Sequence, residues 1–202
     1  MKRFSKLMIL VFLAVLIAVT GCPKSPAVQT SSEMPSFAMS GAKFVYHVEY
    51  FGDEYDFIVD LKNLSKDIEF DWSMTSPMNS SGNVIIREKA LKNATSLFNY
   101  YSNGDTLDME DYTSIWVSKA VYNALKNDDI VTIDAGDGDE TLTFEEIQKF
   151  TVVINGEDKE LDCIYASSDL FGWFWILDSQ KFPLILKMDI GWTITLTEII
   201  TE

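Results

Sequence analysis

Apolar and polar residues alternate along much of this chain, and that pattern restricts its fold more than any other feature. Aromatic and aliphatic residues take every second position over residues 44–50, 55–61 and 68–74. Residues 188–196 alternate most regularly of all. Successive side chains of a strand point to opposite faces, so a period of two predicts strands with one buried and one wet face. The chain is therefore expected to be mainly β.

Turn signals divide these strands into consecutive hairpins. Gly52 and the pair Asn155-Gly156 tolerate the positive φ angles of tight hairpin turns, and a further turn is expected at residues 80–83. Roughly ten strands connected in this way form an antiparallel meander, which must curl, split or close because strand twist accumulates. We expect a curved meander that forms a half-open barrel.

One segment has the period of a helix. Residues 114–126 place apolar side chains on one face, with Ile115, Val121 and Leu125 among them. Thr113 or Ser114 offers a side-chain oxygen for the helix N-cap. This main α-helix is expected to pack on the sheet or in the mouth of the half-barrel.

The N-terminus has the pattern of an export signal. A basic start precedes 13 apolar residues at positions 7–19. A stable membrane-spanning helix needs about 20 apolar residues, so a permanent transmembrane anchor is not expected. Residues 19–22, Val-Thr-Gly-Cys, resemble the bacterial lipobox, in which the cysteine sulfur accepts a diacylglycerol. The resemblance implies a stable lipid anchor on Cys22. The alternative is an ordinary signal peptide with a cysteine near its end.

The lipobox divides the chain into three parts. Residues 1–21 are expected to be the signal peptide, residues 22–40 the lipidated cysteine and a flexible tether, and residues 41–202 a single β-rich domain. Residue 23 is Pro, whereas an Asp there would resemble the inner-membrane retention signal of enteric bacteria. The chain is therefore expected in the cell envelope, on the outer membrane, facing the periplasm or the surface.

Charge and cysteine content exclude some classes of function. The formal charge is −15, and removal of the signal takes away Lys2, Arg3 and Lys6 but no acid, which leaves −18 over 181 residues. Nucleic acid is not an expected partner, because no basic face is present to neutralise phosphates. Lipidation of Cys22 leaves Cys163 without a disulfide partner. Its apolar neighbours indicate a core cysteine rather than a nucleophile.

The sequence offers no catalytic or metal site. His47 is the only histidine, it lies on the polar face of its strand, and the chain has no G-x-S-x-G turn. The acidic residues 134–140 do not fit the EF-hand spacing, because glycine occupies ligand positions, and they are interpreted as a hairpin loop. A non-enzymatic protein without a metal or other cofactor is expected.

The strand expected over residues 171–177 has two apolar faces. One parity carries Phe171 and two tryptophans, and the other carries Phe174 and Ile176. Such a strand is expected to be covered on both sides. The helix over residues 114–126 is one candidate cover. A hydrophobic ligand or acyl chain held between the concave sheet and that helix is the other.

The C-terminal part resembles a known family. Residues 173–178, Trp-Phe-Trp-Ile-Leu-Asp, are followed by Phe182, Pro183 and an aliphatic run to Met188. With the lipobox, tether and meander, this hairpin is similar to the periplasmic lipoprotein-carrier (Lol-type) superfamily and related lipoproteins. The resemblance implies a half-barrel fold and a hydrophobic ligand class. No functional residue of those carriers aligns with a position in this chain.

These observations lead to one functional hypothesis and one alternative. The chain is expected to be a lipid-anchored, non-enzymatic envelope protein that binds a hydrophobic ligand or acyl chain inside the half-barrel. The expected wall residues are Trp173, Phe174, Trp175 and Trp192. The alternative is a structural or interaction lipoprotein with a fully packed core and an acidic face for a protein partner. A connected apolar volume of roughly 300 Å³ or more would favour ligand binding.

Overall fold

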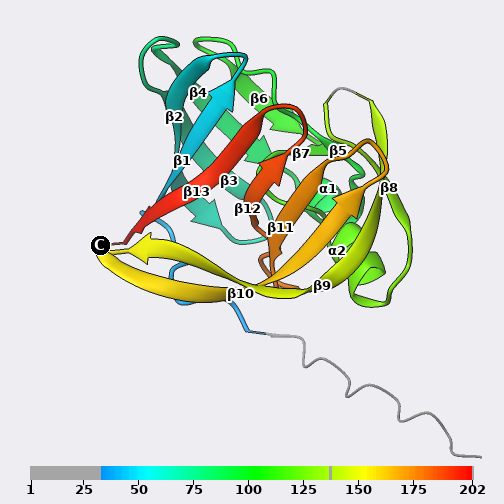
Figure 1. Cartoon of the computed structure of the whole chain (residues 1–202). Helices are drawn as coiled ribbons and strands as arrows, with labels where there is room; N and C mark the ends of the chain where they lie inside the picture. Colours follow the sequence, from blue (N-terminus) through cyan, green and yellow to red (C-terminus); the bar gives the residue numbers. More distant parts are fainter. Residues whose placement is uncertain (1–32, 137, 202) are drawn as a thin grey trace, which may run out of the picture.

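A single curved sheet forms most of the described structure, which is a computed structural model covering residues 33–136 and 138–201. The described residues are 57% strand and 8% helical, and their sheet has 13 strands (Figure 1). The predicted mainly β half-barrel is confirmed. The signal peptide, the lipobox and Cys22 lie outside the described residues.

The strands and helices have the following bounds. The strands are β1 (Lys43–Tyr50), β2 (Asp53–Leu64), β3 (Ile68–Met74), β4 (Ser80–Ile86), β5 (Ser96–Leu97), β6 (Thr106–Met109), β7 (Tyr112–Thr113), β8 (Val131–Asp134), β9 (Asp139–Ile154), β10 (Glu157–Ser168), β11 (Trp173–Leu177), β12 (Ile185–Asp189) and β13 (Thr193–Ile200). The helices are α1 (Glu88–Asn93) and α2 (Lys119–Lys126).

Most neighbouring strands are antiparallel hairpin partners, as the alternation predicts. The order across the sheet is β6-β4-β3-β2-β1-β13-β12-β11-β10-β9-β8-β5-β7. The short strands β5, β6 and β7 were not predicted. β5 pairs in parallel with both β7 and β8, and β6 pairs in parallel with β4. A second contact joins β13 to the far part of β9 in parallel, at Glu198 and Ile199. The sheet therefore curls back on itself along one side.

Two ends of the half-barrel can be distinguished in Figure 1. The turns β1–β2, β3–β4, β10–β11 and β12–β13 lie together at the upper end, here called the turn end. The described chain begins at the opposite end, here called the tether end, near the β2–β3 and β11–β12 connections. There Ser179 Oγ donates a hydrogen bond to the carbonyl oxygen of Glu33 at 3.3 Å.

Two predicted turns have different outcomes. Asn155 and Gly156 have φ angles of 51° and 83° and connect β9 to β10, so that hairpin is confirmed. The turn predicted at residues 80–83 is wrong, because these residues belong to β4. Gly82 lets the neighbouring segments pack closely against the β4 backbone, because a Cβ would lie 2.3 Å from the Asp105 carbonyl oxygen and 2.8 Å from the Trp72 ring nitrogen.

The single strand predicted over residues 188–196 is wrong. The segment is a hairpin in which β12 ends at Asp189 and β13 begins at Thr193. Those two residues face each other across the turn, and Gly191 has a φ of 93°. The alternation continues through the turn, so the periodicity alone does not reveal the reversal.

The helix predicted over residues 114–126 is shorter than expected. α2 begins at Lys119, and the cap is Ser118, whose Oγ accepts a hydrogen bond from the Val121 N–H at 3.3 Å. Residues 115–117 are extended instead, because Ile115 O accepts a hydrogen bond from Ile185 N–H and the backbone of residue 117 donates to residue 183. As expected, α2 packs on the sheet, against β8, β9 and β10.

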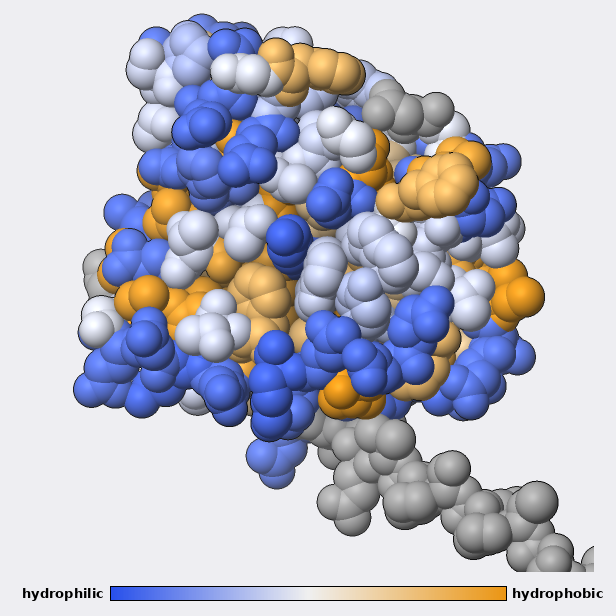
Figure 2. Space-filling view, in the orientation of Figure 1, coloured by the Kyte–Doolittle hydropathy of each residue, from blue (hydrophilic) through white to orange (hydrophobic). Residues whose placement is uncertain are grey.

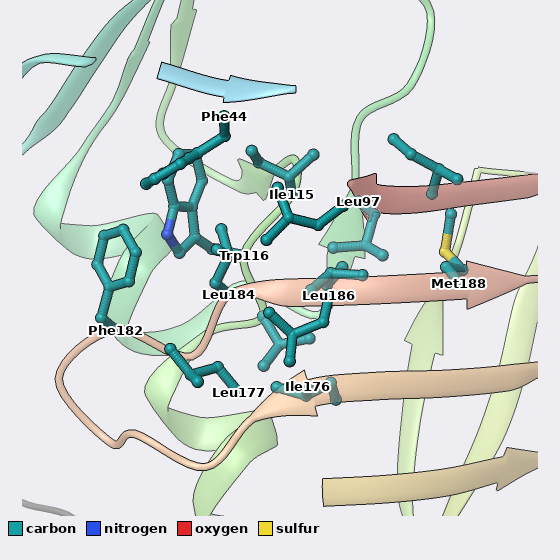
Figure 3. Close-up of a cluster of buried hydrophobic side chains, with 14 of the residues drawn as sticks. Phe44, Leu97, Ile115, Trp116, Ile176, Leu177, Phe182, Leu184, Leu186 and Met188 are labelled. Atoms are coloured by element: carbon teal, nitrogen blue, oxygen red, sulfur yellow. The ribbon is translucent and has the colours of Figure 1, made fainter. Parts of the chain in front are cut away.

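Buried side chains fill the concave side of the sheet. Figure 3 shows the aromatic part of this core around Phe44, Trp116 and Phe182, with aliphatic residues of β11 and β12 beside it. Phe37 also belongs to the core, with its ring 6.3 Å from that of Phe44. The tether predicted to extend to residue 40 is therefore wrong for its last residues, because the domain already includes Phe37.

Cys163 lies in the core, as predicted. The residue is fully buried, and burial raises the pKa of its thiol to about 11. We expect native protein to react with a thiol-specific reagent at pH 8 at least a hundredfold more slowly than urea-unfolded protein, because the thiolate is the reactive form. Mass spectrometry over time measures both rates. Equal reaction rates for native and unfolded protein would show that Cys163 is readily exposed to solvent in the folded state.

Candidate ligand-binding site

Strand β11 has one buried and one partly exposed face. Phe174 and Ile176 are fully buried against the core, whereas Trp173 is 37% exposed and Trp175 is half-buried. The prediction that both faces of this strand are covered is therefore wrong. The reason is that tryptophan tolerates an outer sheet face where its neighbours cover it only in part.

The outer tryptophans pack against side chains of neighbouring strands. The Trp173 ring stacks on Tyr165 at 5.2 Å, and Lys187 Nζ lies 5.0 Å from the centre of the Trp175 ring. Trp175 Nε1 donates a hydrogen bond to Gln148 Oε1 at 3.1 Å. The structure thus places Trp173 and Trp175 outside the half-barrel, away from any interior ligand.

Little space remains inside the half-barrel. An apolar cavity of about 50 Å³ lies between the sheet and residues 97–115. Leu97, Ile115 and Met188 are among its walls, and Figure 3 shows all three pointing inward. A pocket for a small molecule occupies roughly 300–1,000 Å³. An acyl chain does not fit this interior in the conformation described.

An opening of about 220 Å³ at the turn end adjoins the inner cavity. Five residues line both spaces: Tyr55, Met74, Asn99, Tyr101 and Trp192. Tyr50, Met78 and Tyr100 complete the wall of this space, which we call the aromatic opening. Of the predicted wall residues, only Trp192 lies in it; Phe174 is a core residue. The other residues come from four separate segments, and no local sequence pattern marks them.

The polar groups that line the aromatic opening include the hydroxyls of four tyrosines and the amide of Asn99, and none of them carries a formal charge at neutral pH. Tyr101 and Ser114 form a hydrogen bond through their hydroxyl oxygens, and burial raises the pKa of Tyr101 well above its ordinary value. The pKa of Tyr55 is also raised, by burial first and then by Tyr50 and Asp53. Both phenols are therefore neutral at physiological pH. The opening suits an uncharged apolar group.

Two phenylalanines project from turns at the turn end of the half-barrel. Phe51 in the β1–β2 turn is 85% exposed and Phe171 in the β10–β11 turn is 93% exposed. Their φ angles are 48° and 65°, a region that bulky side chains rarely adopt. Figure 2 shows hydrophobic side chains projecting over both turns. Exposed aromatic rings in a strained backbone indicate a role other than folding.

We expect Phe51→Asn to raise the free energy of unfolding by about 0.5–1 kcal/mol, because asparagine tolerates positive φ and the ring buries little surface. Urea denaturation of the two proteins measures the difference. Phe171→Asn is a second case at the same kind of position. A loss of stability in both variants would show that the exposed rings stabilise the fold.

The remaining predicted residues take structural roles. His47 is partly exposed, with Nδ1 3.5 Å from Asp56 Oδ1. β8 ends at Asp134 and β9 begins at Asp139, and the two strands pair as the predicted hairpin, although Asp134, Asp139 and Glu140 lie in the strands rather than in its loop. Within residues 33–136 and 138–201, no group of three or more histidine, cysteine, aspartate or glutamate residues is placed to hold a metal ion. No helix in this part of the chain is long and apolar enough to cross a membrane.

Comparison with known proteins adds no relative. No family model, curated protein or solved structure matches the chain. The resemblance of residues 173–188 to the lipoprotein-carrier superfamily thus stays a prediction. The functional proposal depends on the lipobox and on the geometry of the half-barrel.

Proposed function

We propose that this chain is a lipid-anchored, non-enzymatic protein of the bacterial cell envelope that binds an apolar group at the aromatic opening. The anchor is a diacylglycerol on Cys22, and the expected place is the outer membrane. The observation that carries the binding proposal is the continuity between the aromatic opening and the inner cavity, which share five lining residues.

The size of the two spaces defines the ligand. The inner cavity of about 50 Å³ accepts a short apolar end, such as a few methylene groups, and the opening of about 220 Å³ surrounds the portion that follows. Pockets of this kind are lined mainly by apolar and aromatic groups. A long acyl chain would enter only after residues 97–101 move away from the sheet.

A second candidate is an interaction protein with a packed core. The exposed Phe51 and Phe171 favour it, because isolated aromatic rings on a rim are typical contact residues for a protein partner. In that case the aromatic opening stays empty and the rim alone binds. The two functions predict different results for a small apolar probe.

Lipidation is tested by metabolic labelling with a palmitate analogue. We expect the label on the full chain and on a Cys163→Ser control, and none on Cys22→Ser. We also expect the labelled protein in the membrane fraction and the Cys22→Ser protein in the soluble fraction. A labelled Cys22→Ser protein would overturn the anchor.

Ligand binding is tested on the exported chain carrying Cys22→Ser, with an environment-sensitive hydrophobic dye. We expect saturable binding, which Trp192→Ala weakens roughly tenfold or more, since a buried aromatic contact contributes above about 1 kcal/mol. Trp173→Ala is the matched control, because that ring lies on the outer face of β11. We expect it to bind dye as the unsubstituted protein does.

Two outcomes would contradict the binding proposal. Absence of saturable dye binding, with no lipid extracted from the purified protein, would leave the interaction protein as the better candidate. Equal losses for Trp192→Ala and Trp173→Ala would place the dye outside the aromatic opening.

A further inference from the structure

A second groove lies at the tether end, on the opposite side of the core from the aromatic opening. Its volume is about 200 Å³. Its walls come from five segments of the chain: the start of the described chain at Met34, the β2–β3 connection, α1, the start of α2 with the residues before it, and the β11–β12 connection. Four lysines line it, namely Lys66, Lys92, Lys119 and Lys181. We call it the lysine groove.

The charge of the lysine groove is opposite to that of the whole protein. Glu88 is its only acidic lining residue, and Glu88 forms an ion pair with Lys92 at 2.7 Å. The chain as a whole has 31 acidic and 16 basic residues. A cluster of lysines in so acidic a protein leaves a local positive potential that attracts anions.

Three of the four lysines in the groove have no carboxylate oxygen within ion-pair distance among the described residues. Among the described lysines and arginines, all but four lie within 4.0 Å of a carboxylate oxygen. Three of those four, Lys66, Lys119 and Lys181, line this groove, and the fourth is Lys187 beside Trp175. All three are exposed. Their charges are thus available to a ligand.

The floor of the lysine groove is apolar and contains an unsatisfied donor. Ile68, Val117 and Phe182 contribute buried apolar surface. Trp116 is 1% exposed, and its Nε1 has no hydrogen-bond acceptor among the described residues. A buried N–H without an acceptor costs about 1–3 kcal/mol. An oxygen of a bound molecule would supply the missing acceptor.

The lysine groove lies where the chain leaves for its anchor. Met34 is one of its lining residues and is 43% exposed. Met34 is twelve positions after Cys22 in the sequence. A segment of that length spans at most roughly 40 Å even when fully extended. A lipid on Cys22 therefore keeps this end of the domain close to the membrane surface.

We propose that the lysine groove binds the phosphate headgroup of an anionic membrane lipid, and thereby turns the tether end of the domain toward the bilayer. The lysines hold the phosphate, and the apolar floor receives the glycerol and the first methylene groups. A soluble phosphate would leave this apolar floor without a partner. The position beside the membrane rests on the proposed lipid anchor, whereas the binding chemistry does not.

The test separates the lysine groove from the anchor by using the exported chain with Cys22→Ser. Its co-sedimentation is measured with vesicles of phosphatidylcholine alone and of phosphatidylcholine with phosphatidylglycerol. We expect binding only to the second kind. Each lysine near an anionic surface contributes roughly fivefold to partitioning, so Lys66→Gln, Lys119→Gln and Lys181→Gln together should weaken it roughly a hundredfold.

A control triple variant removes the same charge elsewhere. Lys149→Gln, Lys159→Gln and Lys187→Gln lie on β9, β10 and β12 outside the groove, and we expect their combination to bind the anionic vesicles nearly as well as the parent chain. Thermal unfolding of both triple variants checks that they are folded. Trp116→Phe replaces the indole by a smaller aromatic ring that lacks the N–H donor, and should cause a smaller loss of vesicle binding than the groove triple variant.

Three outcomes would overturn the proposal. The first is equal binding of the parent chain to the two kinds of vesicle. The second is a loss of binding in the control triple variant as large as that in the groove triple variant, which would indicate general electrostatic attraction. The third is saturable binding of inorganic phosphate in calorimetry without binding to anionic vesicles, which would assign the groove to a soluble anion. Palmitate labelling of Cys22 is unaffected by any of these, so failure of this proposal and failure of the lipid anchor are distinguishable.

Discussion

Asp178→Ala is expected to lower the free energy of unfolding by about 3–5 kcal/mol, because it strands a buried charge. Lys126 Nζ lies 3.1 Å from Asp178 Oδ2, and the two side chains are only 9% and 6% exposed. Tyr122 donates a hydrogen bond to the other carboxylate oxygen at 2.6 Å. The substitution leaves an ammonium group buried without its partner.

This ion pair connects two parts of the fold that are far apart in sequence. Tyr122 and Lys126 belong to α2, whereas Asp178 follows directly after β11. The carboxylate thus holds the helix against the end of the aromatic strand. Loss of this link is expected to loosen α2 first, which hydrogen exchange of the α2 amides would detect.

Urea denaturation measures the predicted loss, with Asp162→Ala as the matched control. Asp162 pairs with Lys149 at 2.8 Å, but both side chains are more than half exposed. The control should change stability by less than about 1 kcal/mol. The double variant Lys126→Met/Asp178→Ala should recover part of the loss, because no uncompensated charge remains. A similar effect of Asp178→Ala and Asp162→Ala would contradict the argument.

Phe182→Ala is expected to cost a similar amount, about 3–5 kcal/mol, through loss of buried surface and creation of a cavity. Phe182 is 1% exposed, and its ring lies 5.6 Å from Trp116, 6.1 Å from Phe44 and 6.5 Å from Phe37. These four rings form the aromatic centre of the tether end, and Figure 3 shows Phe44, Trp116 and Phe182. Phe182 also contributes to the floor of the lysine groove.

The matched control removes the same side chain at the surface. Phe171→Ala should change the free energy of unfolding by no more than about 0.5 kcal/mol, because the ring is 93% exposed. Chemical denaturation followed by tryptophan fluorescence compares the variants. Equal losses at positions 171 and 182 would show that Phe171 packs against the protein in solution.

The two proposed sites lie at opposite ends of one packed core. The tether end holds the lysine groove, and the turn end holds the aromatic opening and the exposed Phe51 and Phe171. An anchor at the tether end would leave the turn end directed away from the bilayer. In this arrangement the membrane is contacted by one end while the other remains open to an apolar ligand.

Parts of this architecture follow from local sequence alone. The period of two predicted most of the long strands, because alternate side chains of a strand face opposite sides. Asn155-Gly156 determined a tight turn, since both residues adopt positive φ at low cost. The apolar neighbours of Cys163 were sufficient to place it in the core. Each of these features depends on residues adjacent in the chain.

Only the tertiary structure decided what covers each face. Residues 115–117 have helical periodicity but pair with residues 183–185, because backbone hydrogen bonds to a neighbouring segment outweigh local propensity. Trp173 and Trp175 were predicted as interior walls but lie outside, since cross-strand neighbours partly cover them. Apolar residues on both faces of a strand indicate burial, but they do not identify the segment that covers each face.

The two candidate sites likewise depend on residues that are remote in sequence. The lysine groove brings Lys66, Lys119 and Lys181 together from three separate segments, and the aromatic opening joins Tyr55 to Trp192. The sequence by itself was sufficient for most of the long strands, because alternation is a short-range pattern, and the export signal and the lipidation motif stay predictions from equally short patterns. The position of a charge or ring relative to distant segments is decided only when the sheet curls, and that long-range geometry creates both sites.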